Sequence, residues 1–184
     1  MPETYPPIDL SGLGIAEIAR LAAERKLPPV ERWDPPHCGD SQMRIARDST
    51  WYHEGEPIRR EALVRLFSTV LRREADGSHV LVTPAEKLDI QVEDTPFVAT
   101  EVVSEGGGRN RRLAFRLNTG DVVVAGPEHP LRLAGDQLNL VVRGGLEARV
   151  DRPVWYELAE DAIAEGGDTP GLWSDGAFFP FVPA

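Results

Sequence analysis

The residues that could carry metal or nucleophilic chemistry in this 184-residue chain are few and scattered. One cysteine, Cys38, stands in the run His37-Cys38-Gly39-Asp40, which brings three potential metal ligands within four residues. Neighbours on an extended chain point in opposite directions, and the other histidines, at 53, 79 and 129, have no ligand spacing. We therefore expect no metal and no cofactor. A reactive or redox-sensing Cys38 would need a base that meets it in the fold.

Other sequence patterns of enzymes are missing as well. The glycine-rich run Glu105-Gly106-Gly107-Gly108-Arg109 lacks the lysine and hydroxyl residue of a phosphate-binding P-loop, so we interpret it as a hairpin loop. Glu128-His129 lies between two prolines, which is typical of a rigid surface turn rather than of a catalytic dyad. The sequence favours a protein that is not an enzyme, and an enzyme with an unfamiliar active site is the alternative.

Four aromatic residues fall on expected strands, where such side chains usually fill a core: Trp51, Tyr52, Phe178 and Phe179. The alternative is stacking against the base of a ligand. A stacking platform for nucleic acid normally comes with a basic groove, whereas this chain has 30 acidic and 20 basic residues and a net charge of −10. That balance argues against binding to nucleic acid or to anionic membranes.

The same composition bears on the compartment. A single cysteine excludes an intramolecular disulfide framework, which suits a reducing compartment. The N-terminal residues have neither a basic region nor an apolar run typical of a secretory signal. No stretch approaches the roughly 18 consecutive apolar residues needed to span a bilayer. We expect a cytoplasmic protein.

Hydrophobic spacing predicts the elements that position these residues. Apolar residues at helical spacing predict helices at about 13–26, 59–73 and 153–165, and four prolines predict an extended strap near 28–36. Alternating or continuous apolar runs predict strands. The expected strands are at about 43–45, 51–52, 79–83, 87–93, 97–104, 112–117, 122–125, 138–143, 146–150 and 172–181.

Two short matches between the halves of the chain indicate an internal repeat. Asp48 with Pro57 recurs as Asp121 with Pro130, 73 residues later. The spacing of Leu88 and Val92 recurs 58 residues later, at Leu146 and Val150. The two offsets differ by about the length of the helix at 59–73, which the second half lacks at that place. We predict an α+β fold made of two related units with antiparallel sheets. Residues 1–36 would form an arm, helix and strap, and 37–105 and 106–184 the two units.

The ordered segments of the chain resemble a bacterial family named domain of unknown function 1285. The likeness runs from CGDSQMRIARDSTWYHEGEPIRR (38–60) through LVTPAEKLDI (81–90) and LEARVDRPVWYEL (146–158) to WSDGAFFPF (173–181) and covers roughly residues 9–182. Where the family has Asp-Gly at the first hairpin turn, this chain has Asp48-Ser49, which bears on the left-handed geometry of that turn. The resemblance implies a duplicated core whose second unit is superficially like a pleckstrin-homology-like barrel.

The resemblance also implies a ligand site between the units, a nucleotide-like ligand and a role in signal transduction, with no activity assigned. We therefore expect a small anionic ligand to be bound by residues of the family-matching segments. The candidates are Arg59, Asn118, Asp121, Arg143 and Arg149, in which arginine would bind the anion and Asn118 a base or sugar.

Each of these candidates also has a purely structural interpretation. Arginines on strands usually pair with nearby carboxylates, such as Glu147 or Asp151, and Asn118 with Asp121 would cap a hairpin turn. A further alternative is an adaptor that binds a partner protein through a sheet edge or through its aromatic C-terminal strand.

Overall fold

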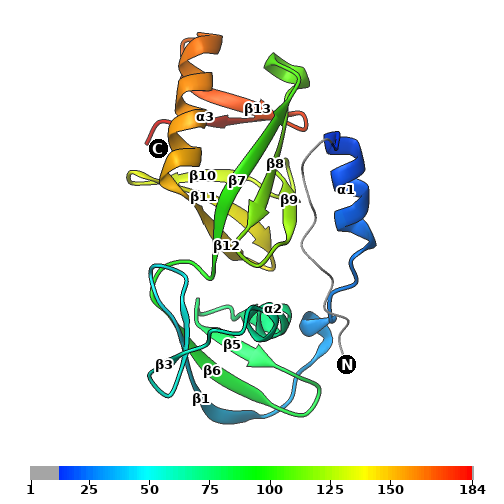
Figure 1. Cartoon of the computed structure of the whole chain (residues 1–184), viewed down its shortest axis with the longest axis vertical. Coiled ribbons are helices and arrows are strands. Elements are labelled where there is room, and N and C mark those ends of the chain that lie inside the picture. The colour runs from blue at the N-terminus through cyan, green and yellow to red at the C-terminus, as the bar shows by residue number, and fades with distance from the viewer. Residues whose placement is uncertain (1–12, 184) are drawn as a thin grey trace. The chain divides into compact units, whose positions relative to one another are not determined.

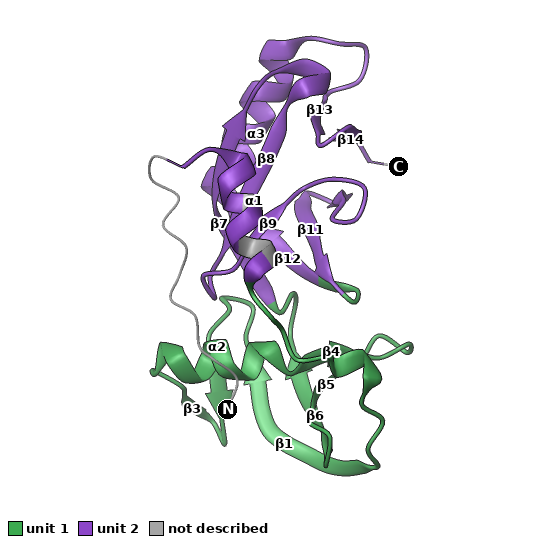
Figure 2. Cartoon of the chain, turned by 90° about the vertical axis from the view of Figure 1, so that its right-hand side faces the viewer, with its two compact units in different colours: residues 1–6, 25–96, 144–146 green, residues 7–24, 97–143, 147–184 purple. Residues whose placement is uncertain are grey.

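The chain folds into two compact units in a computed structural model that describes residues 13–183 (Figure 2). Unit 1 contains residues 25–96 and 144–146, and unit 2 contains residues 13–24, 97–143 and 147–183. The proline-rich arm expected at the N-terminus lies outside the described residues. Among these residues, no helix is both long and apolar enough to cross a membrane.

Unit 1 is a six-stranded sheet with one helix. Its elements are the short turn η1 (Val30–Arg32), β1 (His37–Ile45), β2 (Trp51–His53), β3 (Glu56–Pro57), α2 (Glu61–Thr69), β4 (Leu71–Arg73), β5 (His79–Val82) and β6 (Lys87–Val92). The strand order is β3-β2-β1-β6-β5-β4, in which β1 and β6 are parallel and the other pairs are antiparallel. The buried Trp51 stacks on Phe67 of α2 with ring centroids 6.5 Å apart, so the helix packs on this sheet.

Unit 2 contains a second six-stranded sheet of the same topology. Its strands are β7 (Phe97–Glu105), β8 (Arg112–Leu117), β9 (Val122–Val124), β10 (Leu131–Ala134), β11 (Gln137–Arg143) and β12 (Leu146–Val150), in the order β10-β11-β12-β7-β8-β9. As in unit 1, the first and the last strand of the unit pair in parallel at the centre, here β7 with β12. Its core is formed by fully buried residues that include Phe97, Phe115, Leu138 and Leu140.

Unit 2 also has elements without a counterpart at the same place in unit 1 (Figure 1). Helix α1 (Ile15–Glu24) lies against β8 and β9, with Ile15 and Ile18 buried against Ala114 and Val122. Helix α3 (Arg152–Glu165) follows the last strand; its N-cap Asp151 accepts a hydrogen bond from the N–H of Arg152, and proline occupies its first turn. A two-stranded hairpin, β13 (Gly171–Ser174) and β14 (Ala177–Pro180), ends the described chain.

The hairpin is joined to the main sheet of unit 2 through one buried hydroxyl group. The Ser174 Oγ accepts the N–H of Leu113 at 2.9 Å and donates to the carbonyl of Ala125 at 2.7 Å. Ser174 is fully buried, so these bonds replace hydrogen bonds to water for two backbone groups of the sheet. The position of β13 relative to β8 is therefore defined at this residue.

The α+β fold in two related units is confirmed, and several elements differ from the prediction, among them β3 and β10, which no predicted strand covers. Each sheet contains one parallel pair. The first and the last strand of each unit lie next to each other at the centre of the sheet and run in the same direction. The helix expected at 59–73 ends at Thr69, since the Val70 carbonyl accepts the N–H of Val82 and β4 then pairs with β5. The single strand expected at 172–181 is a hairpin, because Asp175 and Gly176 both adopt positive φ and reverse the chain.

Candidate functional site

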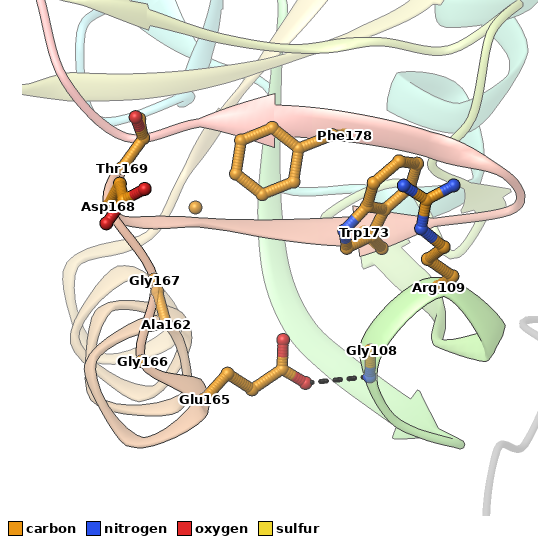
Figure 3. Close-up of a pocket in the computed structure, with 11 residues that line it drawn as sticks. Gly108, Arg109, Ala162, Glu165, Gly166, Gly167, Asp168, Thr169, Trp173 and Phe178 are labelled. Atoms are coloured by element: carbon orange, nitrogen blue, oxygen red, sulfur yellow. Dashed lines mark hydrogen bonds between the residues drawn. The ribbon is translucent and has the colours of Figure 1, made fainter.

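A pocket of about 760 Å³ lies in unit 2, outside the main sheet. Three segments form it: the η2 turn (Gly108–Asn110) between β7 and β8, the C-terminal end of α3 with the loop that follows, and the β13–β14 hairpin (Figure 3). Its volume lies within the range of about 300–1,000 Å³ typical of small-molecule sites. The pocket is open to solvent, and the side chains that project into it are aromatic, basic, acidic and hydroxyl-bearing.

Two aromatic rings form one wall of the pocket. Trp173 and Phe178 are paired residues of β13 and β14, so both project from the same face of the hairpin. Their ring centroids are 5.4 Å apart and their planes are tilted by 54°. Gly171 makes this packing possible, because a Cβ there would lie 2.7 Å from the Phe178 Cζ and 2.4 Å from the Phe179 carbonyl oxygen. We call Trp173 and Phe178 the aromatic pair.

Arg109 on the η2 turn lies over the first of these rings. Its guanidinium carbon is 4.7 Å from the centroid of Trp173, within the range of a cation–π contact. The other arginines of this loop have carboxylate partners, Arg111 with Asp161 and Glu165, and Arg112 with Asp175. Arg109 has no carboxylate partner among the residues that the structure describes, so its hydrogen-bond donors face the pocket and solvent.

The turn that carries Arg109 is held in place by the last residue of α3. The Glu165 carboxylate accepts the N–H of Gly108 at 3.0 Å and the Nε of Arg111 at 3.1 Å. Arg111 is itself buried, and it also donates to the Ser104 hydroxyl. The hydrogen bond from Arg111, followed by that from Gly108, lowers the pKa of Glu165, although partial burial opposes this shift. Glu165 thus remains charged and fixes the backbone next to Arg109.

The loop after α3 forms the opposite end of the pocket. Helix α3 ends at Glu165 and is followed by Gly166, whose φ of +62° is readily available only to glycine. Gly167, Asp168 and Thr169 come next. Asp168 and Thr169 are exposed, and neither side chain forms a hydrogen bond or ion pair within the described chain. Figure 3 shows them at the far side of Phe178 from Arg109.

The ligand-binding residues expected from the sequence do not line this pocket. Asn118 closes the β8–β9 turn, where its Oδ1 accepts the N–H of Val98 at 3.0 Å, and Asp121 accepts the Thr119 hydroxyl at 2.9 Å. Arg149 of β12 is paired with Val98 of β7. Asn118 and Arg149 therefore lie on either side of Val98.

The two remaining candidates belong to different units. Arg143 at the end of β11 lies over the ring of Phe97 at 5.2 Å. Arg59 belongs to unit 1, where it is exposed just before α2. The structure therefore brings Asn118, Asp121, Arg143 and Arg149 near the start of β7 in unit 2 and leaves Arg59 in unit 1. The ligand role of all five residues stays a prediction.

The four aromatic residues considered for stacking differ in how far they are buried. Trp51 and Phe179 are buried in the cores of their units, and Tyr52 is half-buried with the Arg44 guanidinium 4.3 Å from its ring centroid. Phe178 is 37% exposed and lines the pocket. Sequence reasoning missed Arg109 and Trp173, although a glycine-rich loop ending in three closely spaced arginines was the available signal.

The segment around Cys38 has no feature of a built site. The exposed Cys38 thiol donates to the Pro36 carbonyl, and His37 pairs with Asp89 at 2.9 Å. Within residues 13–183, no group of three or more histidine, cysteine or carboxylate side chains is placed to hold a metal ion.

Comparison with known proteins identifies relatives but no activity. A crystal structure of a DUF1285 family protein from Silicibacter pomeroyi DSS-3 is 45% identical, with 92% of this chain and 95% of that chain covered and a TM-score of 0.79. A second, from Shewanella baltica OS155, is 20% identical over 69% of this chain and 94% of that chain, with a TM-score of 0.54, and shows a similar fold. No curated protein matches.

The family profiles cover most of the chain. Residues 28–95 match the N-terminal domain of DUF1285, described as a domain of unknown function, and residues 96–181 match its C-terminal domain. The boundary between the two profiles, at residues 95 and 96, lies one residue from the division between the two units, at residues 96 and 97. The chain belongs to the DUF1285 family.

Proposed function

We propose that this protein binds a small anionic ligand with a planar ring, nucleotide-like in character, in the pocket of unit 2, and that it acts as a binding or sensor module rather than as an enzyme. The observation that carries the proposal is Arg109 held over Trp173 at 4.7 Å, next to Phe178 and without a carboxylate partner in the described residues. A guanidinium in this state offers paired N–H donors to a phosphate or carboxylate.

The setting of Arg109 explains why an anion would bind there in an acidic protein. The net charge of −10 repels anions at long range, but that repulsion is screened within about 8–10 Å at physiological salt. At short range, Arg111 and Arg112 have their charges compensated by Asp161, Glu165 and Asp175. The uncompensated charge of the loop is that of Arg109, and the aromatic pair beside it provides a surface on which a flat ring can stack.

Two of the residues expected from the sequence, Asn118 and Arg149, are the alternative candidates for binding the same ligand. Arg149 of β12 and Asn118 in the turn after β8 lie on either side of Val98 of β7, so both belong to one region of unit 2. The two sites make different predictions for substitution. Loss of binding in Arg149→Ala rather than in Arg109→Ala would favour the alternative.

A thermal-shift titration of the full chain tests the proposal, with AMP, GMP and inorganic phosphate as probes. A ligand at 100 times its dissociation constant stabilises a protein by about 2.7 kcal/mol, which corresponds to roughly 5 °C or more at this chain length. We expect a nucleotide to raise the melting temperature of the wild type and to leave that of Arg109→Ala unchanged.

The matched control is Arg132→Ala, which removes an exposed arginine of β10 that does not line the pocket. It should keep the full ligand-induced shift. A wild-type chain that none of the probes stabilises at millimolar concentration would contradict the proposal and would favour the adaptor function.

A further inference from the structure

We propose that Asp168 makes the pocket selective for a guanine-type ring edge, so that the ligand is a guanine nucleotide rather than an adenine nucleotide. This inference rests on the proposed function, since it names the ligand class of the same pocket. It is carried by the order of three chemical groups across the pocket: a guanidinium at one end, the aromatic pair in the middle, and a carboxylate with a neighbouring hydroxyl at the other end (Figure 3).

The charges at the two ends of the pocket fix the direction in which a ligand must lie. Its anionic group belongs at Arg109, and the like charge of Asp168 excludes it from the opposite end. A planar ring stacks where the exposed face of Phe178 is available, between these two charges. The ring edge remote from the anionic group then faces Asp168 and Thr169.

The carboxylate of Asp168 selects the hydrogen-bonding groups of that ring edge. An ionised carboxylate can only accept hydrogen bonds, so it favours a ring edge that carries N–H donors. Guanine presents a ring N–H beside an exocyclic amine, two parallel donors that match the two carboxylate oxygens. Adenine presents an amine beside a ring nitrogen with a lone pair, and that lone pair would face the carboxylate. Hydrogen bonds to the edge of a base are the usual means by which a protein distinguishes one base from another.

Asp168 is available for such a contact with a ligand. Its side chain is exposed and has no hydrogen bond or ion pair within the described chain, unlike Glu165, which is engaged by Gly108 and Arg111. Gly166 and Gly167 precede it, and an added Cβ at Gly166 would have open space around it. Because Asp168 itself is exposed and lines the pocket, its carboxylate is accessible to a ring that rests on Phe178.

The test is calorimetric titration of the full chain with GMP, IMP and AMP, all as monophosphates. Because a hydrogen bond to a charged group contributes more than a neutral one, we expect GMP to bind about tenfold more tightly than AMP. IMP keeps the ring N–H and lacks the exocyclic amine, so it should fall between them. Asp168→Asn should weaken GMP binding about tenfold and leave AMP binding equal or tighter, because an amide can donate to the adenine ring nitrogen.

Two controls separate this inference from the function on which it rests. Asp136→Asn removes an exposed carboxylate from the β10–β11 turn, outside the pocket, and should keep the GMP preference. GMP and AMP that bind equally well, and that both lose affinity in Arg109→Ala, would overturn the guanine preference and leave the proposed function intact. An absence of binding by all three nucleotides would overturn both.

Discussion

At the scale of single residues, three arginines in one loop illustrate how the surroundings decide the role of a side chain. Arg111 is 8% exposed and donates to Ser104, Asp161 and Glu165, so its charge is compensated by carboxylates of the protein itself. Arg109, two residues earlier, is exposed over an aromatic ring. The sequence Arg109-Asn110-Arg111-Arg112 gives no sign of this division, because it depends on which carboxylates α3 and the C-terminal hairpin bring to the loop.

The first prediction follows from this contrast. Arg111→Ala leaves Asp161 and Glu165 without their partner, and breaking a buried ion pair is strongly destabilising. Because both carboxylates are partly exposed, we expect a loss of about 2 kcal/mol in the free energy of unfolding rather than the full value for a buried pair. Chemical denaturation should show this loss, whereas Arg109→Ala should change the stability by less than about 1 kcal/mol.

The second prediction concerns the pH dependence of stability. The pKa of Glu165 is lowered in the folded state, chiefly by the hydrogen bond from Arg111, so the carboxylate stabilises the fold above its ordinary pKa, near 4.5. This contribution is lost as the pH falls through the lowered folded-state pKa. Glu165→Gln should therefore be less stable than the wild type at pH 7, and the difference should shrink as the pH is lowered below about 4.5.

Denaturant unfolding at a series of pH values measures this difference. Glu160→Gln is the matched control, because it changes an exposed glutamate on the same helix that forms no ion pair within the described chain. It should have little effect at pH 7. A Glu165→Gln deficit that stayed constant down to pH 3 would show that the carboxylate charge does not hold the η2 turn.

At the scale of elements, the repeat is visible in the strand order more clearly than in the sequence. The match of Leu88 and Val92 with Leu146 and Val150 joins β6 and β12, which are equivalent as the last strands of the two sheets. The match of Asp48 with Asp121 does not join equivalent turns, since Asp48 precedes the second strand of its unit and Asp121 the third. Its 73-residue offset is therefore wrong as a guide to the repeat.

Most strands were predictable, and the reasons for the errors are physical. The alternation of Leu88, Ile90 and Val92 reports a half-buried strand but contains no information on whether its neighbour is parallel. The C-terminal hairpin had a clear signal in Asp175-Gly176, a pair strongly favoured in two-residue hairpin turns. At the first hairpin turn, Ser49 adopts the left-handed conformation (φ +67°) without a glycine, as the Asp48 side chain accepts the N–H of Thr50.

The candidate site was less predictable than the fold. Phe178 was identified as an aromatic residue with a choice between core and stacking, but the sequence could not show that its pairing with Trp173 directs both rings to the pocket. The pocket joins residues 108–109, 162–169 and 171–178, and their meeting depends on α3 packing beside β13. Contacts between distant segments of this kind leave no local pattern in the chain.

The third prediction tests the turn on which the aromatic pair depends. Gly176 has a φ of +82°, so Gly176→Ala strains the hairpin and should lower the free energy of unfolding by about 1 kcal/mol or more. Gly107→Ala is the matched control, because Gly107 has extended backbone (φ −153°) and open space around an added Cβ. Thermal unfolding compares the two variants, and equal melting temperatures would contradict a strained turn at Gly176.

At the scale of the whole molecule, the duplicated sheet supplies a scaffold and the elements outside it supply the site. Both units contain the same six-stranded topology, but the pocket is built from α3, the η2 turn and the β13–β14 hairpin, which follow or interrupt the sheet of unit 2. In unit 1 the chain passes from β6 directly into β7, so no helix and hairpin follow its last strand. The candidate site therefore belongs to the second of the two related units.

The most direct test of this account is the GMP affinity of the wild-type chain compared with that of its Arg109→Ala variant, measured by isothermal titration calorimetry at fixed salt concentration. Arg109 is the uncompensated cation of the pocket, and its removal leaves the aromatic pair and Asp168 in place. We predict a single site in the wild type and a loss of affinity of tenfold or more in the variant. Equal affinity in the two proteins, or no measurable binding to the wild type, would contradict the account.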